Sequence, residues 1–107
     1  MNKGHVFPIG VYIQITVKEK DITTCALIDT GSEISIFKGF LINQWNNEVH
    51  IKIKGVTGDA EDIKRSAQQV DVILGSKIIP IKRVYEYNAL ECDILLGNEF
   101  LQQFQYY

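Results

Sequence analysis

ALIDTGSEISIF, residues 26–37, is the stretch that decides how this chain folds. Its apolar first half predicts a buried strand that delivers Asp29 to its end, where Gly31 lets the backbone turn sharply and lets a bound molecule approach closely. Thr30 and Ser32 add hydroxyls that can hydrogen-bond around the carboxylate. An ordinary turn after a strand has the same composition, because Asp and Gly are common turn formers. Taken alone, the stretch fits either a catalytic carboxylate or a plain turn.

The rest of the chain reads as short strands separated by turns. Five runs rich in β-branched and aromatic residues, or alternating between apolar and polar, predict strands over residues 11–17, 23–28, 49–54, 69–74 and 77–84. Pro80 lies within the last run and places it at a sheet edge or a bulge. We therefore expect an all-β fold, a small closed β-barrel, in a single domain spanning residues 1–107.

Helix is scarce in this pattern. Residues 98–104 predict one short C-terminal helix, with Asn98 as the N-cap and with Phe100, Leu101 and Phe104 on one apolar face. A shorter helical turn is possible over residues 40–45.

Composition and charge exclude several functions. A net charge of −2 and the lack of a basic stripe with interleaved aromatic residues argue against nucleic-acid binding. The apolar runs are far too short to cross a membrane. The first residues lack the apolar stretch of a signal peptide, so a reducing, cytoplasmic compartment is expected.

The two cysteines and two histidines do not form a metal-binding pattern. His5 and His50 have no clustered ligand neighbours, so we expect neither a metal nor a cofactor. Cys25 and Cys92 are expected to be buried thiols, with a single disulfide as the alternative.

A second motif lies sixty-odd residues after Asp29 and reads DILLGNEFL, residues 93–101. Together with residues 26–37 it resembles the two signatures of the aspartic proteases, an Asp-Thr-Gly-Ser after an apolar strand and a late apolar-apolar-Gly before a helix. The glycine-bearing hairpin of residues 52–64 lies where that family has its mobile flap. Order, spacing and length resemble the retropepsin-like proteases, and LLGNEFL is most similar to those of bacilliform plant pararetroviruses (badnavirus- or tungrovirus-like).

The resemblance implies a retropepsin-type barrel and an aspartic endopeptidase that processes a viral polyprotein in the host cytoplasm or the virion. It assigns catalysis to Asp29, Thr30 and Gly31, support of the carboxylate to Ser32, and a flap to about residues 49–66. The residues implied to bind an extended peptide substrate are Gly31, Glu33, Val56, Thr57 and Gly58.

A single Asp-Thr-Gly in the chain implies a homodimer, because the reaction needs two carboxylates and each copy supplies one. The alternative is a non-proteolytic dimerisation or interaction domain on the same barrel, against which the intact Asp29-Thr30-Gly31 argues.

Three features are specific to this chain. Retroviral enzymes commonly have an arginine directly after the late glycine, paired with an acid near the active site, where this chain has Asn98. Glu33 is the acid expected to pair with that arginine, so it needs another partner in this chain. Retroviral enzymes hold their dimer together largely with a β-sheet formed by the chain termini. Only residues 98–107 follow Gly97 here, so a weak dimer is expected. The hydroxyl of Ser32 is expected to hydrogen-bond the carboxylate of Asp29, with a bond to its own turn as the alternative.

Overall fold

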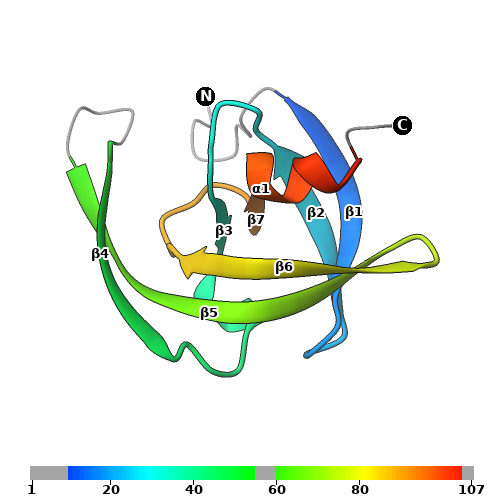
Figure 1. Ribbon diagram of the computed structural model, residues 1–107, viewed down its shortest axis with the longest axis horizontal. Helices are drawn as coiled ribbons and strands as arrows, with labels where there is room; N and C mark the ends of the chain where they lie inside the picture. Colours follow the sequence, from blue (N-terminus) through cyan, green and yellow to red (C-terminus); the bar gives the residue numbers. More distant parts are fainter. Residues whose placement is uncertain (1–9, 55–59, 105–107) are drawn as a thin grey trace, which may run out of the picture.

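The computed structural model describes residues 10–54 and 60–104, which form a seven-stranded sheet and a short C-terminal helix (Figure 1). The strands are β1 (Val11–Val17), β2 (Ile22–Ile28), β3 (Ser35–Phe37), β4 (Asn47–Lys54), β5 (Ala60–Leu74), β6 (Lys77–Glu86) and β7 (Ile94–Leu96). The helical elements are the 3₁₀ turn η2 (Gly39–Leu41), the helix α1 (Asn98–Leu101) and the 3₁₀ turn η3 (Gln102–Phe104). No helix in this described part of the chain is long and apolar enough to cross a membrane.

Six of the strands close into a barrel. The sheet runs in the order β1-β2-β7-β3-β6-β5-β4, and a further pairing of Val17 with Val72 joins β1 to β5. The amide N–H of Lys18 extends that seam by donating to the carbonyl of Asp71 at 3.0 Å. This seam pairs the end of β1 with β5 and so closes the sheet on itself. The predicted small closed β-barrel with one short C-terminal helix is confirmed.

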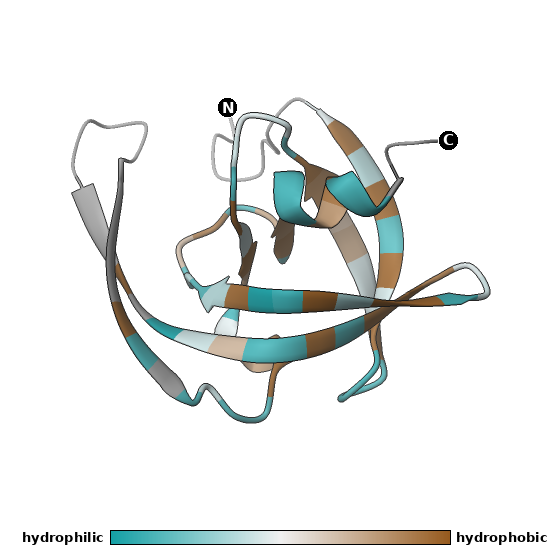
Figure 2. Cartoon of the chain, in the orientation of Figure 1, coloured by the Kyte–Doolittle hydropathy of each residue, from teal (hydrophilic) through white to brown (hydrophobic). Residues whose placement is uncertain are grey.

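The core lies inside this barrel and follows the alternation of the strands. Inward positions such as Ile15, Val17 and Ala26 are buried, whereas Gln14 and Cys25, each next to an inward residue in its strand, are exposed. Figure 2 shows the same banding of apolar and polar residues along β5 and β6. Helix α1 contributes Phe100, which is 1% exposed and belongs to the same buried cluster. The apolar face predicted for residues 98–104 is thus confirmed for Phe100.

Strand β7 lies between β2 and β3 and holds together the two motifs of the sequence. It pairs in parallel with β2, Ala26 beside Ile94, and antiparallel with β3, Ile36 beside Leu95. Asp93, just before β7, accepts a hydrogen bond from Thr24 Oγ1 at 2.6 Å and one from the backbone N–H of Lys38 at 3.0 Å. The strand that leads into Asp29 and the strand that leads into Gly97 therefore lie side by side.

Several predicted boundaries need correction. Strand β5 has 15 residues and begins at Ala60, rather than covering residues 69–74 alone. The helical turn predicted for residues 40–45 is shorter, a 3₁₀ turn of three residues (η2) that starts one residue earlier and ends at Leu41. Pro80 lies where β6 has only β5 beside it, so its strand is locally an edge as predicted, and the Pro80 carbonyl accepts a bond from Gln103 Nε2 at 2.9 Å.

The predicted flap corresponds to the β4–β5 hairpin, which curves away from the barrel (Figure 1). Its arms pair antiparallel from Asn47 beside Ser66 to Lys54 beside Ala60. The expected substrate contacts Val56, Thr57 and Gly58 lie outside the described residues.

An ion pair fixes the base of this hairpin. Arg65 on β5 donates from Nε to Glu86 Oε1 at 2.6 Å and from Nη2 to Oε2 at 2.7 Å, a bidentate pair. Glu86 is the last residue of β6, and Asn88 beyond it accepts a bond from the N–H of Gly39 at 2.7 Å. The hydrogen bond from Arg65 is the main cause that lowers the pKa of Glu86 below its ordinary 4.5.

We predict that this pair makes stability depend on pH. Because the folded pKa of Glu86 is lowered, its contribution is complete above a pH near the ordinary pKa and disappears as the pH falls through the folded value. Glu86→Gln should therefore lower the free energy of unfolding at pH 7, and the difference from the wild type should shrink as the pH falls toward 3. Urea unfolding from pH 7 down to about 3 measures this. Glu91→Gln, a change at an exposed carboxylate, is the control. A difference that persists unchanged in acid would contradict the prediction.

Candidate active site

Asp29 follows β2 directly and continues the pairing of β2 with β7. Its backbone N–H donates to the carbonyl of Leu96 at 3.0 Å, and its own carbonyl accepts the N–H of Ser32 at 3.1 Å, which closes a tight turn. The side chain is half-buried, whereas Thr30 and Gly31 are exposed. A carboxylate is therefore fixed at the barrel surface on a turn that is open to another molecule.

Gly31 holds the carboxylate in place. Its N–H donates to Asp29 Oδ1 at 2.9 Å, which fixes the plane of the carboxyl group and leaves Oδ2 for other partners. A Cβ on Gly31 would lie 3.3 Å from the same oxygen, tighter than an ordinary contact. The Asp29 carboxylate would have to move by a few tenths of an ångström to accommodate a larger residue at this place.

Ser32 does not make the contact that we expected from the sequence. Its Oγ donates to the carbonyl of Ile34 at 2.8 Å, within its own turn. This is the alternative considered in the sequence analysis, and it makes Ser32 a residue that shapes the turn in this structure.

We predict from this contact that Ser32→Ala leaves the acidic limb of the kcat/KM profile in place. The substitution should instead lower the free energy of unfolding by about 1 kcal/mol, the typical net contribution of one hydrogen bond. Rate profiles between about pH 3 and 8, with urea unfolding alongside, measure both quantities. An upward move of the acidic limb by half a unit or more would show that the hydroxyl bonds Asp29 during the reaction.

The second motif, residues 93–101, packs directly against the first, residues 26–37, at Gly97. Gly97 donates its N–H to Oγ of the buried Ser35 at 3.1 Å. A Cβ at Gly97 would lie 2.3 Å from the carbonyl oxygen of Ile34 and 2.7 Å from that of Ser32, so no larger residue fits without moving backbone. The late glycine is required because two chain segments approach closely there.

Asn98 is a residue whose contacts the sequence analysis did not predict. It is not the N-cap, because Gly97 occupies that place and Asn98 is the first helical residue. Its side-chain Nδ2 donates to the carbonyl of Thr30 at 2.9 Å, and its backbone N–H donates to that of Ser32 at 2.7 Å. The only hint in the sequence that this position has a distinct role was that Asn98 replaces the arginine of retroviral enzymes.

Glu33 is exposed, and neither of the two ion pairs found among residues 10–54 and 60–104 includes it. It follows Ser32 in the chain, at the turn that carries Asp29.

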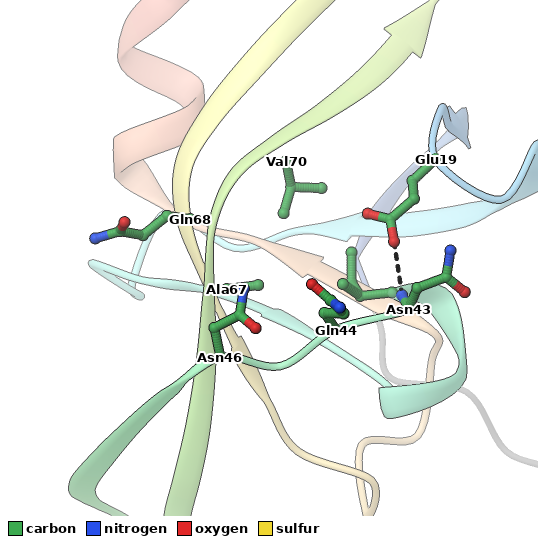
Figure 3. A pocket seen from close by; sticks show the side chains of 8 residues that line it. Glu19, Asn43, Gln44, Asn46, Ala67, Gln68 and Val70 are labelled. Carbon is green, nitrogen blue, oxygen red and sulfur yellow. Dashed lines mark hydrogen bonds between the residues drawn. The ribbon is translucent and has the colours of Figure 1, made fainter.

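Two hollows lie away from this turn. One of about 400 Å³ is lined by amide side chains and by Glu19, whose Oε2 accepts the backbone N–H of Asn43 at 2.8 Å (Figure 3). The other, of about 620 Å³, is lined by residues that include Tyr12, Cys25 and Cys92. Both thiols are free, and Cys25 is exposed rather than buried as expected. Burial is the main cause that raises the pKa of Cys92.

The closed barrel with one short C-terminal helix has the small all-β architecture of the retropepsin-like fold. The family model described as cauliflower mosaic virus peptidase (A3) matches residues 7–107. The chain belongs to this family, which confirms the resemblance to pararetroviral proteases; its relation to the bacilliform group stays a prediction. No curated protein matches the chain.

Proposed function

We propose that this chain is an aspartic endopeptidase that works as a homodimer, with one Asp29 from each copy in a shared site. The observation that carries the proposal is the exposed turn, which presents one oriented carboxylate and belongs to the only Asp-Thr-Gly in the chain. Membership of a viral peptidase family supports the same conclusion. A twofold axis through this turn would bring two identical turns together.

Two carboxylates about 3 Å apart cannot both be ionised, and the aspartic proteases are the standard example of such a pair. The ionised Asp29 accepts a proton from a bound water, and the resulting hydroxide attacks the carbonyl carbon of the scissile peptide bond. The protonated Asp29 of the other copy donates its proton to the carbonyl oxygen. The Asp29 that took the proton from water then gives it to the amide nitrogen. The other Asp29 takes a proton back from a hydroxyl of the diol as the C–N bond breaks, which releases an amine and a carboxylic acid and restores the pair. The two apparent pKa values belong to the pair.

The remaining assignments follow the resemblance. Thr30 would brace the dimer across the twofold axis, and the carbonyl of Gly31 and the side chain of Glu33 would contact the substrate backbone. The β4–β5 hairpin would close over an extended peptide, with Val56, Thr57 and Gly58 at its tip. The substrate would be a viral polyprotein, processed in the host cytoplasm or in the virion, with no cofactor required.

A cleavage assay on a long peptide, with and without a statine-type inhibitor, tests the catalytic type directly. Cleavage that the inhibitor blocks supports an aspartic protease. The absence of cleavage by a protein shown to be dimeric would favour the non-proteolytic dimerisation domain instead.

We predict that specific activity depends on enzyme concentration. Half-sites are inert, so below the dimer Kd a tenfold dilution should lower the activity per chain about tenfold. Progress curves over a dilution series, with sedimentation at the same concentrations, measure this. A monomer with constant specific activity would contradict the shared site.

A further inference from the structure

We propose that Asn98 is a positioning residue of the active site and orients Asp29 through the peptide group that joins Thr30 to Gly31. The inference rests on the proposed function, because orientation of Asp29 matters only if that carboxylate reacts. The hydrogen bonds of Asn98 go to the carbonyl groups of Thr30 and Ser32, not to Asp29 itself. Its effect passes through the backbone of the turn.

The Thr30–Gly31 peptide group is bonded on both sides. Its carbonyl accepts the side-chain Nδ2 of Asn98 at 2.9 Å, and its N–H donates to Asp29 Oδ1 at 2.9 Å. The described part of the chain contains no cis peptide bond, so the C=O and N–H of this group point in opposite directions within one plane. The amide of Asn98 on one side and the carboxylate on the other therefore fix the rotation of a single rigid unit.

The side chain of Asn98 contributes something that its backbone cannot. The bond from the N–H of Asn98 to the carbonyl of Ser32, 2.7 Å long, is available to any residue except proline at this position. The bond to Thr30 needs an amide side chain of this length. Thr30 and Gly31 are both exposed, so without that donor water takes its place at the Thr30 carbonyl and the peptide group loses one of its two anchoring hydrogen bonds.

A chain of hydrogen bonds also polarises its members. An N–H group donates more strongly when the carbonyl of the same peptide group is itself hydrogen-bonded. Asn98 thus strengthens, as well as aims, the N–H that holds Asp29 Oδ1. A neutral amide can do this beside a carboxylate pair without adding charge, unlike the arginine that retroviral enzymes have at this position.

The test compares Asn98→Ala with Gln103→Ala. Gln103 lies five positions further along and makes the same type of bond, from Nε2 to the carbonyl of Pro80 at 2.9 Å, away from the turn. Both variants lose one amide-to-carbonyl hydrogen bond, so their losses in urea stability should be similar. Turnover is measured per dimer, at enzyme concentrations where sedimentation shows complete dimerisation.

We expect Asn98→Ala to lower kcat at least about tenfold with KM changed less than about threefold, because a misaligned reacting group costs turnover rather than binding. Gln103→Ala should leave kcat within about twofold of the wild type. Asn98→Asp, nearly isosteric but with an oxygen facing the Thr30 carbonyl, should be as impaired as Asn98→Ala. A wild-type kcat per dimer in both Asn98 variants would overturn the inference.

A second readout does not require activity. The amide proton of Gly31 should exchange faster with solvent and change its NMR chemical shift in Asn98→Ala, and should do neither in Gln103→Ala. An unchanged Gly31 amide in Asn98→Ala would overturn the inference even if kcat fell. The proposed function fails separately, if the dimeric wild type cleaves no peptide; in that case the NMR result still decides whether Asn98 orients the turn.

Discussion

Asp29→Asn is expected to lower peptide cleavage by at least about 10³-fold, because an amide can neither take the proton from water nor carry the negative charge of the pair. The fold should survive. Asparagine is nearly isosteric, and its side-chain oxygen can still accept the N–H of Gly31 that now bonds Asp29 Oδ1. Asp21→Asn is the matched control, since Asp21 lies in a turn with φ 54°, a conformation that asparagine tolerates well.

Cleavage assays on both variants, with urea unfolding to establish that each is folded, measure the effect. Mixing gives a sharper test of sharing. When equal amounts of the wild type and Asp29→Asn are allowed to exchange subunits as full dimers, random pairing puts half of the wild-type chains into heterodimers, so activity should fall by about half. Undiminished activity in the mixture, or a folded Asp29→Asn that cleaves at more than about 1% of the wild-type rate, would rule out a shared Asp29 site.

The sequence predicted the strands with a strong local signal and missed what depended on neighbours. The β-branched and aromatic run of β1 gave the bounds Val11–Val17 correctly. Residues 65–68, Arg-Ser-Ala-Gln, contain no β-branched or aromatic residue, so the long strand β5 was predicted only in part. Pairing with β4 on one side and with β6 on the other supplies the hydrogen bonds that hold those residues in the strand.

The candidate site shows the same division. The position of Asp29 at the end of a strand could be predicted, because an apolar run leads directly into it, and the structure places it there. The close packing around Gly97 could not be predicted, since it depends on the carbonyl groups of Ser32 and Ile34. The partner of the Ser32 hydroxyl could not, since a serine in a turn can reach either a carboxylate or a backbone carbonyl and only the turn geometry decides. Asn98 was predicted as the N-cap because Asn favours that position, whereas in the structure Gly97 is the N-cap and Asn98 is the first helical residue.

Gly97→Ala, which adds a single methyl group, is expected to cause a large loss of stability. The backbone of Gly97 has φ −95°, which alanine adopts freely, so the cost is steric and not conformational. A Cβ there would lie 2.3 Å from the Ile34 carbonyl oxygen and 2.7 Å from that of Ser32. Both atoms are backbone in the turn that carries Asp29, so neither can move away as a flexible side chain would.

Relief of this clash requires β7 and the turn after β2 to separate, which would stretch the bond from Gly97 N–H to Ser35 Oγ and displace Asp29. We expect Gly97→Ala to lower the free energy of unfolding by about 3 kcal/mol, at the upper end for overpacking, and to abolish cleavage even in the fraction that stays folded. Urea unfolding and cleavage assays measure the two effects. Gly75→Asn is the control, because Gly75 has φ 64° with nothing within 4 Å of an added Cβ, so asparagine should cost only a few tenths of a kcal/mol there. A folded Gly97→Ala that is as stable and as active as the wild type would show that the close packing at Gly97 does not hold the turn that carries Asp29 in place.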